Sequence, residues 1–316
     1  MTSSVGTTAT TPSATSPAVE RRTELAAFLR SRRERIRPED VGLPPGHRRR
    51  TSGLRREEVA QLAGVGVTWY TWLEQGRPIN ASTQVLDAIA RTLRLDPVER
   101  THLYRLADVL ASDQLASCGD CTLPAEVQHV LDAFAATPAS VVNERFDLLA
   151  WNDMYATVFP RVTSAAPAER NTLLATLTMP ACCNPVGSPE RVCDTMIGQL
   201  RVAYGRHVGD PAWTHFIRRL EALSPAFAEA WAAHDLAQPA KWVKAFRHPG
   251  VGLIRVTSTS FALSAVPGTR MIVYTPSDDE SRIALEKLAD GEGQDAHFPC
   301  WPDHSPQRHV LTAATT

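Results

Sequence analysis

The chain has 316 residues, of which 43% are hydrophobic, and a formal net charge of -1 at pH 7. This length allows two globular domains, since domains typically contain about 100 to 200 residues. The sequence has no apolar run of about 20 residues, which a transmembrane helix needs. We therefore expect a soluble, cytoplasmic protein without a membrane partner.

The charge is unevenly distributed along the chain. Residues 1–110 hold 17 basic and 12 acidic side chains, a net charge of +5, and the remainder holds 16 and 22, a net charge of -6. A basic module joined to an acidic one predicts that only the first meets nucleic acid.

The chain is expected to begin with a disordered tail over residues 1–20. Ser, Thr, Ala and Pro dominate this segment, which has neither a basic start nor an apolar run and so does not match a signal peptide. A helix is then predicted from Glu24 to Arg37, with Leu25, Phe28 and Leu29 at core-facing spacing.

Residues 54–76 have the pattern of two short helices joined by a sharp turn. Ala60 is small enough to let the helices approach, Gly64 suits a left-handed turn residue, and Tyr70 and Leu73 fall on one side of the second helix. This is the outline of a helix-turn-helix motif. The alternative is an ordinary helical hairpin whose polar face meets only water.

The second of these helices has an open side rich in hydrogen-bonding groups. Such a side can touch base edges in a major groove of DNA. The candidate base-contacting residues are Thr68, Thr71, Trp72 and Gln75, with Trp69 at the border of this side.

Arginines are concentrated before and within the motif. Residues 20–56 contain twelve Arg and five acidic residues, and Arg suits planar contacts with phosphate oxygens. A solvated helix face is the alternative explanation for Arg30, Arg33 and Arg37. The candidate phosphate or minor-groove contacts are Arg48, Arg49, Arg50, Arg55 and Arg56.

Two further helices complete an all-helical domain over residues 21–111. Ser82 is expected to cap one of them, and Asp96 followed by Pro97 and Glu99 predicts the start of the other. Residues 23–110 resemble the helix-turn-helix of phage-repressor and Cro proteins, and are similar to the MmyB-like bacterial transcriptional regulators. The resemblance is carried by Leu-Arg-Arg-Glu-Glu-Val-Ala (54–60), Trp-Tyr-Thr-Trp-Leu-Glu-Gln-Gly-Arg (69–77) and the arginine-rich stretch 42–51.

Residues 112–123 are predicted to form a linker that contains Cys118 and Cys121. Their Cys-x-x-Cys spacing is that of a metal knuckle or a redox pair. A zinc site would need two more ligands, which Cys182, Cys183 and Cys193 could supply only if the fold brought them near. We expect no metal and no cofactor.

An α/β domain is predicted over residues 124–290, followed by an irregular tail over 291–316. A helix at 126–134 precedes strands at 140–142 and 146–151, and Asn152 is expected to cap the next helix, as at the start of a PAS-type sensor domain. Helices are expected from 168 to 233, with breaks at 180–189, 210–211 and 224–225. Antiparallel strands at 251–257, 259–263 and 271–275 and a helix at 281–289 follow.

This half of the chain again resembles the MmyB-like regulators, whose C-terminal part is a PAS-like ligand-binding domain. The matching stretches are 142–152, 168–171, 204–211, 224–235 and 247–252, while residues 178–194 depart from the family pattern. The resemblance implies a small apolar, fatty-acid-like effector. The candidate pocket residues are Trp151, Phe159, Arg201, Trp231, His234 and His248.

Each of these pocket candidates also has a structural explanation. Trp151 and Trp231 can be core residues, and His248 can hold a turn before Pro249. No nucleophile elbow, zinc-protease motif, phosphate loop or dinucleotide fingerprint occurs, so we expect no enzyme activity.

The sequence therefore predicts a DNA-binding transcriptional regulator. By analogy with repressors, we expect it to bind double-stranded DNA as a homodimer. An all-α helix-turn-helix domain precedes an α/β PAS-like domain with an antiparallel sheet and inserted helices. An effector domain that senses thiol or metal state, or a protein partner, stays open as the alternative.

Overall fold

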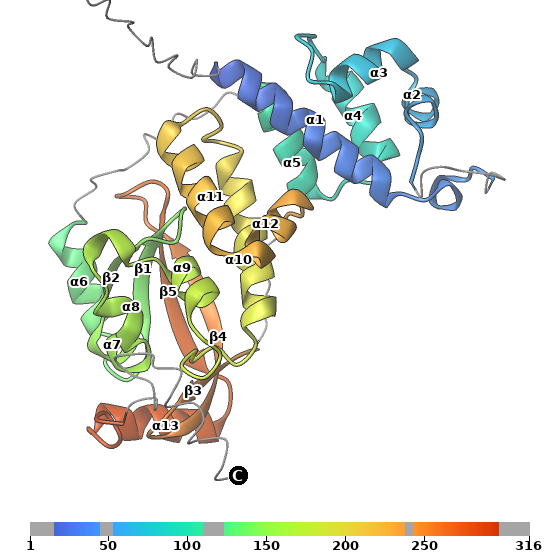
Figure 1. The fold of residues 1–316 in the computed structure, drawn as a ribbon. Coiled ribbons are helices and arrows are strands. Elements are labelled where there is room, and N and C mark those ends of the chain that lie inside the picture. The colour runs from blue at the N-terminus through green and yellow to red at the C-terminus, as the bar shows by residue number, and fades with distance from the viewer. Residues whose placement is uncertain (1–15, 45–52, 110–122, 238–242, 297–316) are drawn as a thin grey trace, which may run out of the picture. The chain divides into compact units, whose positions relative to one another are not determined.

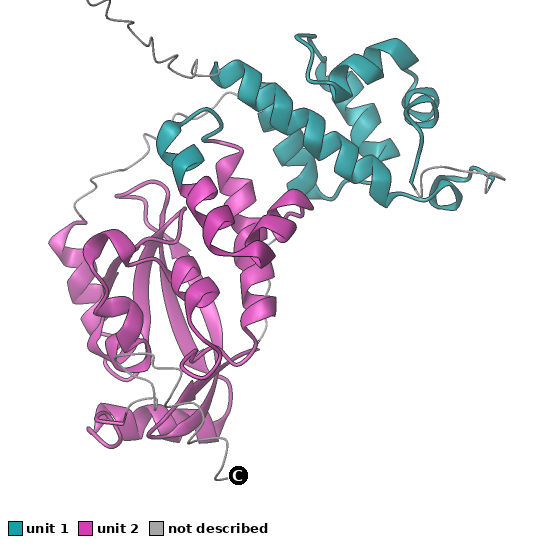
Figure 2. Ribbon diagram, in the orientation of Figure 1, with its two compact units in different colours: residues 1–110, 207–215 teal, residues 111–206, 216–316 magenta. Residues whose placement is uncertain are grey.

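The computed structural model describes residues 16–44, 53–109, 123–237 and 243–296. The chain divides into two compact units, residues 1–110 with 207–215 and residues 111–206 with 216–316 (Figure 2). None of the described helices is both long and apolar enough to cross a bilayer. The predictions for residues 1–15, for most of the linker and for residues 297–316 lie outside the described residues.

The N-terminal unit contains helices throughout (Figure 1). Its core is formed by apolar side chains that recur at helical spacing, among them the fully buried Phe28, Leu29, Leu86 and Leu103. The elements are α1 (Pro17–Arg35), the 3-10 helix η1 (Pro38–Val41), α2 (Arg56–Ala63), α3 (Val67–Glu74), α4 (Thr83–Thr92) and α5 (Pro97–Leu106).

The start of α1 corrects the predicted tail. The helix begins at Pro17, seven residues before the predicted Glu24, so residues 17–20 are helical. Proline at the first helical position has its φ already set for a helix, and the four residues that follow include no helix breaker. The two predicted caps are confirmed, because Ser82 accepts from the Val85 N–H at 3.4 Å and Asp96 accepts from the Glu99 N–H at 2.9 Å.

The C-terminal unit is built on a five-stranded antiparallel sheet of order β2-β1-β5-β4-β3. The helical unit followed by a sheet-containing one confirms the predicted fold class, while the PAS-like assignment stays a prediction. The strands are β1 (Ala139–Asn143), β2 (Leu148–Trp151), β3 (Val243–His248), β4 (Gly252–Ala262) and β5 (Thr269–Pro276).

The third and fourth strands differ from the prediction. Strand β3 was not predicted. Its polar residues Lys244, Arg247 and His248 interrupt the alternation of apolar and polar residues that identifies a strand. The predicted strands 251–257 and 259–263 are one continuous strand, β4. Its first half pairs with β3 and its second half with β5, so a change of partner replaces the predicted break.

Among the described residues, a helix precedes β1, another follows β5, and further helices are inserted between β2 and β3, with the predicted breaks confirmed (Figure 1). The Asn152 side chain caps the first of the inserted helices by accepting from the Tyr155 N–H at 2.9 Å, as predicted. The elements are α6 (Ala125–Asp132), α7 (Asp153–Val158), α8 (Pro160–Thr163), η2 (Pro167–Glu169), α9 (Thr172–Thr178), α10 (Pro189–Tyr204), α11 (Pro211–Leu223), α12 (Pro225–Ala232) and α13 (Asp279–Ala289).

The two faces of the sheet have separate apolar clusters. Met271 and Val273 of β5 pack with Leu131 of α6 on one face. The alternate residues Ile272 and Tyr274 face the larger cluster, which includes residues of α7, α8 and α10. Because side chains alternate along a strand, this register decides which residues surround the cavity described below.

Candidate functional site

The turn between α2 and α3 has the predicted geometry. Gly64 ends α2 with φ 68° and Gly76 follows α3 with φ 70°, both in the left-handed region that favours glycine. Tyr70 and Leu73 are buried against the rest of the unit, as is Ala60 of α2. The predicted packing side of α3 is therefore confirmed.

The opposite side of α3 carries the predicted base-contacting residues. Thr68 and Gln75 are exposed, Trp72 is 40% exposed, and Trp69 and Thr71 are half-buried. The Arg77 guanidinium lies 5.6 Å from the centroid of the Trp72 ring. Arg77, which follows the capping glycine, was not among the predicted residues and adds a cation beside this side of the helix.

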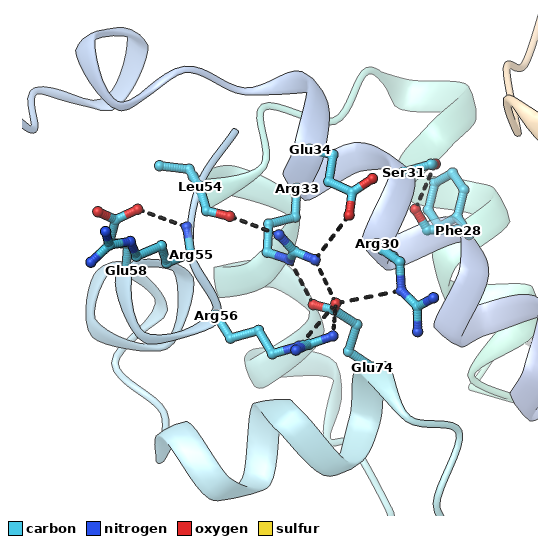
Figure 3. Close-up of polar contacts among 10 residues, drawn as sticks. All are labelled: Phe28, Arg30, Ser31, Arg33, Glu34, Leu54, Arg55, Arg56, Glu58 and Glu74. Carbon is cyan, nitrogen blue, oxygen red and sulfur yellow. Dashed lines mark hydrogen bonds and ion pairs between the residues drawn. The ribbon is translucent and has the colours of Figure 1, made fainter. Parts of the chain in front are cut away.

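A buried carboxylate holds α3 in place, and the sequence did not reveal it. Glu74, with none of its side chain exposed, accepts two hydrogen bonds from Arg33 of α1, at 2.8 and 2.7 Å (Figure 3). Arg56, at the start of α2, lies 3.0 Å away and Arg30 lies 3.8 Å away. One carboxylate thus ties α3 to both preceding helices.

This network bears on two expectations about arginines and corrects the one for Arg33. Arg33 does not belong to a solvated face, since it is buried and also donates to the Leu54 carbonyl at 2.8 Å. Burial opposes its charge, but the hydrogen bonds and charge of Glu74 outweigh burial and raise the pKa of Arg33. Arg56 also forms an ion pair with Glu74, and its role as a phosphate contact stays a prediction.

The other predicted phosphate contacts lie near the start of α2. Arg55 is exposed and its guanidinium lies 3.5 Å from Glu57. Arg48, Arg49 and Arg50 lie outside the described residues. Gly53, which follows that segment, approaches the backbone of α1 so closely that a Cβ atom there would lie 2.4 Å from the Glu34 carbonyl oxygen. A larger residue at position 53 would therefore push the chain away from α1 at this point.

The C-terminal unit contains a cavity of about 410 Å³ between the sheet and the inserted helices. Its sheet side is formed mainly by alternate residues of three strands, as the period of two favours, and Thr259 of β4 is the exception. Most of its helix side is apolar, with Val158, Val162, Ala175 and Met196. The strand residues are Lys244, Phe246 and His248 of β3, Ser258, Thr259 and Ser260 of β4, and Arg270, Ile272 and Tyr274 of β5.

Three Lys and Arg side chains line this mostly apolar cavity, Lys244 and Arg270 on the sheet side and Arg161 of α8 on the helix side. Burial and, to a smaller extent, the charge of Arg270 together lower the pKa of Lys244 to about 8. The Arg270 guanidinium lies 4.8 Å from the Phe146 ring centroid and 3.5 Å from the Gln199 side-chain oxygen. Burial also lowers the pKa of Arg270. A ligand carboxylate placed between Lys244 and Arg270 would raise the pKa values of both side chains.

Of the predicted pocket residues, Phe159 and His248 line the cavity. The Phe159 ring lies 4.8 Å from the Phe246 ring and 4.7 Å from the Tyr155 ring, between centroids. His248 also accepts from the Gly250 N–H at 3.2 Å, so it holds the predicted turn as well.

The other four predicted residues do not line the cavity. Arg201 is fully buried, 3.8 Å from the Trp231 ring centroid and 2.8 Å from the His234 Nδ1. These three residues join α10 to the end of α12 as a structural cluster. Trp151 is half-buried, with the Arg170 guanidinium 5.3 Å from its ring centroid. Their role in ligand binding therefore stays a prediction, and it finds no support in the residues that line this cavity.

Comparison with known families gives two matches. Residues 24–103 match a helix-turn-helix domain, and residues 123–288 match the ligand-binding domain of MmyB-like transcription regulators. The second match covers the whole sheet and every residue that lines the cavity except Ala296. A comparison with curated proteins finds no match.

Proposed function

The chain belongs to the MmyB-like transcription regulators, and on that premise we propose that an apolar acid in the cavity modulates sequence-specific binding to double-stranded DNA. The exposed polar side of α3 supports base contacts. The exposed Arg55 and Arg77 support contacts with phosphates. We also propose that the protein is a cytoplasmic homodimer without enzyme activity.

The effector part of the proposal rests on Lys244 and Arg270, two of the three cations that line the cavity. Lys244 and Arg270 supply positive charge in a space whose other walls are mainly apolar. Hydrogen bonds between a cation and a carboxylate are stronger than those between neutral groups. An amphipathic monoanion, such as a fatty acid, places its carboxylate at the cations and its hydrocarbon chain against the helices.

Substitutions on α3 and near α2 are expected to separate sequence reading from phosphate binding. Gln75→Ala and Thr71→Ala should alter sequence preference. Arg55→Ala and Arg49→Ala should each weaken binding to all sequences and reduce the salt slope by about one unit. Titrations of a selected DNA duplex at several salt concentrations measure both. Arg282→Ala, in α13, is the matched control with an unchanged slope, and an unchanged slope for Arg49→Ala would refute its phosphate role.

Native mass spectrometry of the purified full chain tests the effector. We expect a bound acid that is released under denaturing conditions. Reconstitution of the ligand-free protein with dodecanoate should change its affinity for the DNA duplex. A matched alcohol, dodecanol, should bind more weakly because it lacks the charge that Lys244 and Arg270 recognise. DNA affinity that is independent of dodecanoate would contradict the proposed coupling.

A further inference from the structure

Two adjacent cysteines lie in the segment between α9 and α10. The Cys182 and Cys183 sulfurs are 3.2 Å apart, in a turn in which the Cys183 N–H donates to the Pro180 carbonyl at 2.9 Å. Neighbouring side chains in a helical turn point about 100° apart. The two sulfurs are therefore close because the side-chain rotamers of Cys182 and Cys183 turn the thiols toward each other.

This segment forms part of the cavity wall. Cys183 and Val186 line the cavity, and the segment is held against β3 by backbone hydrogen bonds. The Gly187 N–H donates to Ala245 at 2.7 Å, and the Arg247 N–H donates to Pro185 at 2.7 Å. A change in the peptide between the two cysteines is therefore transmitted to residues that face the ligand.

We propose that Cys182 and Cys183 form a reversible vicinal disulfide when a hydroperoxide oxidises them, and that ring closure reshapes the effector cavity. The partly exposed Cys182 thiolate attacks the peroxide, which forms a sulfenic acid and releases an alcohol or water. The Cys183 thiol then attacks the Cys182 sulfur, the S–S bond forms and water leaves. Two thiols are oxidised and one peroxide bond is reduced.

The geometry of the pair favours reversibility. Consecutive Cα atoms are about 3.8 Å apart, which is below the usual range for disulfides, so the closed ring is strained and readily reduced by a thiol. Cys193 is the contrasting case, since burial, with the nearby Asp194 and Glu190, raises the pKa of its thiol to about 12. Its thiol is therefore the internal control for oxidation.

Peroxide treatment of the reduced full chain, followed by alkylation and peptide mass spectrometry, tests the proposal. The peptide that contains Cys182 and Cys183 should lose two hydrogens and carry no alkyl group, and dithiothreitol should restore both alkylation sites. Cys193 should stay alkylatable after unfolding. Ring closure should also weaken dodecanoate binding about tenfold, because a close-packed wall cannot absorb the change.

Variants make the outcome unambiguous. Cys183→Ser should stop at a sulfenic acid on Cys182, which dimedone traps, whereas Cys193→Ser should still close the ring. Alkylation of both Cys182 and Cys183 after peroxide treatment, or a disulfide from either to another cysteine, would overturn the proposal. These thiol measurements do not depend on an acid effector, so they distinguish this proposal from the proposed function.

Discussion

Glu74→Gln is expected to lower the free energy of unfolding of the N-terminal unit by about 3 to 5 kcal/mol. The substitution removes the negative charge that compensates Arg33, whose side chain is only 5% exposed, and leaves that cation buried. Urea unfolding of the full chain measures the effect. Hydrogen exchange at the amides of α3 assigns it to the N-terminal unit.

Two matched variants sharpen the test of Glu74. Glu57→Gln removes an exposed carboxylate from α2 and should change stability by less than about 0.5 kcal/mol. The double variant Arg33→Met with Glu74→Leu should recover most of the loss, because it removes both buried charges together. If Glu74→Gln were as stable as the wild type, the network would contribute no net stability.

Lys244→Met is expected to stabilise the C-terminal unit by about 2 to 3 kcal/mol at pH 7. Burial, with a smaller contribution from Arg270, lowers the pKa of Lys244 from 10.5 to about 8 in the folded protein. The unfolded chain therefore binds more protons between these two pH values, and wild-type stability rises with pH across that range. Below about pH 8 the full cost of the buried charge is present.

The gain from Lys244→Met should accordingly be largest below pH 8 and disappear as the pH approaches 10.5. Urea unfolding at a series of pH values measures it. Lys287→Met, at an exposed position of α13, is the control and should change stability little at any pH. A gain that does not vary between pH 7 and 10 would show that burial of charge at Lys244 is not its cause.

The same substitution should weaken dodecanoate binding at pH 7 by about ten- to a hundredfold, which corresponds to the loss of one charged hydrogen bond. Affinity of the wild type should be full below about pH 8 and fall as Lys244 loses its proton. Isothermal titration calorimetry on ligand-free protein measures both. Equal affinity of wild type and Lys244→Met would remove Lys244 from the proposed ligand site.

The expected effects of Lys244→Met on stability and on dodecanoate binding together give a reason for a cation that lowers stability to lie in the cavity. A side chain that lowers stability in the empty protein is favourable when a ligand carboxylate compensates it. Stability and ligand affinity should therefore change in opposite directions in Lys244→Met, which a purely structural lysine would not do.

Local signals were sufficient for the turn between α2 and α3 and for the two helix caps of the N-terminal unit. Gly64, Gly76 and the caps Ser82 and Asp96 act within one helical turn, so their neighbours in sequence largely decide the backbone there. The apolar period of 3.6 residues identified the buried side of α3 for the same reason. The remaining side of α3 had to be the exposed one, which is why the exposure of Thr68 and Gln75 could be predicted.

The partners of charged side chains were decided by tertiary structure. Arg33 and Glu74 are 41 residues apart, and nothing local distinguishes Arg33 from the arginines beside it. Likewise, Lys244 and Arg270 meet at the cavity because β3 and β5 turn alternate residues toward the same side of the sheet. Trp231 and Arg201 had suitable chemistry for a pocket, but the packing of α10 and α12 brought them to each other. Residue type and period are local properties, whereas burial and charge pairing depend on segments that meet only after the chain folds.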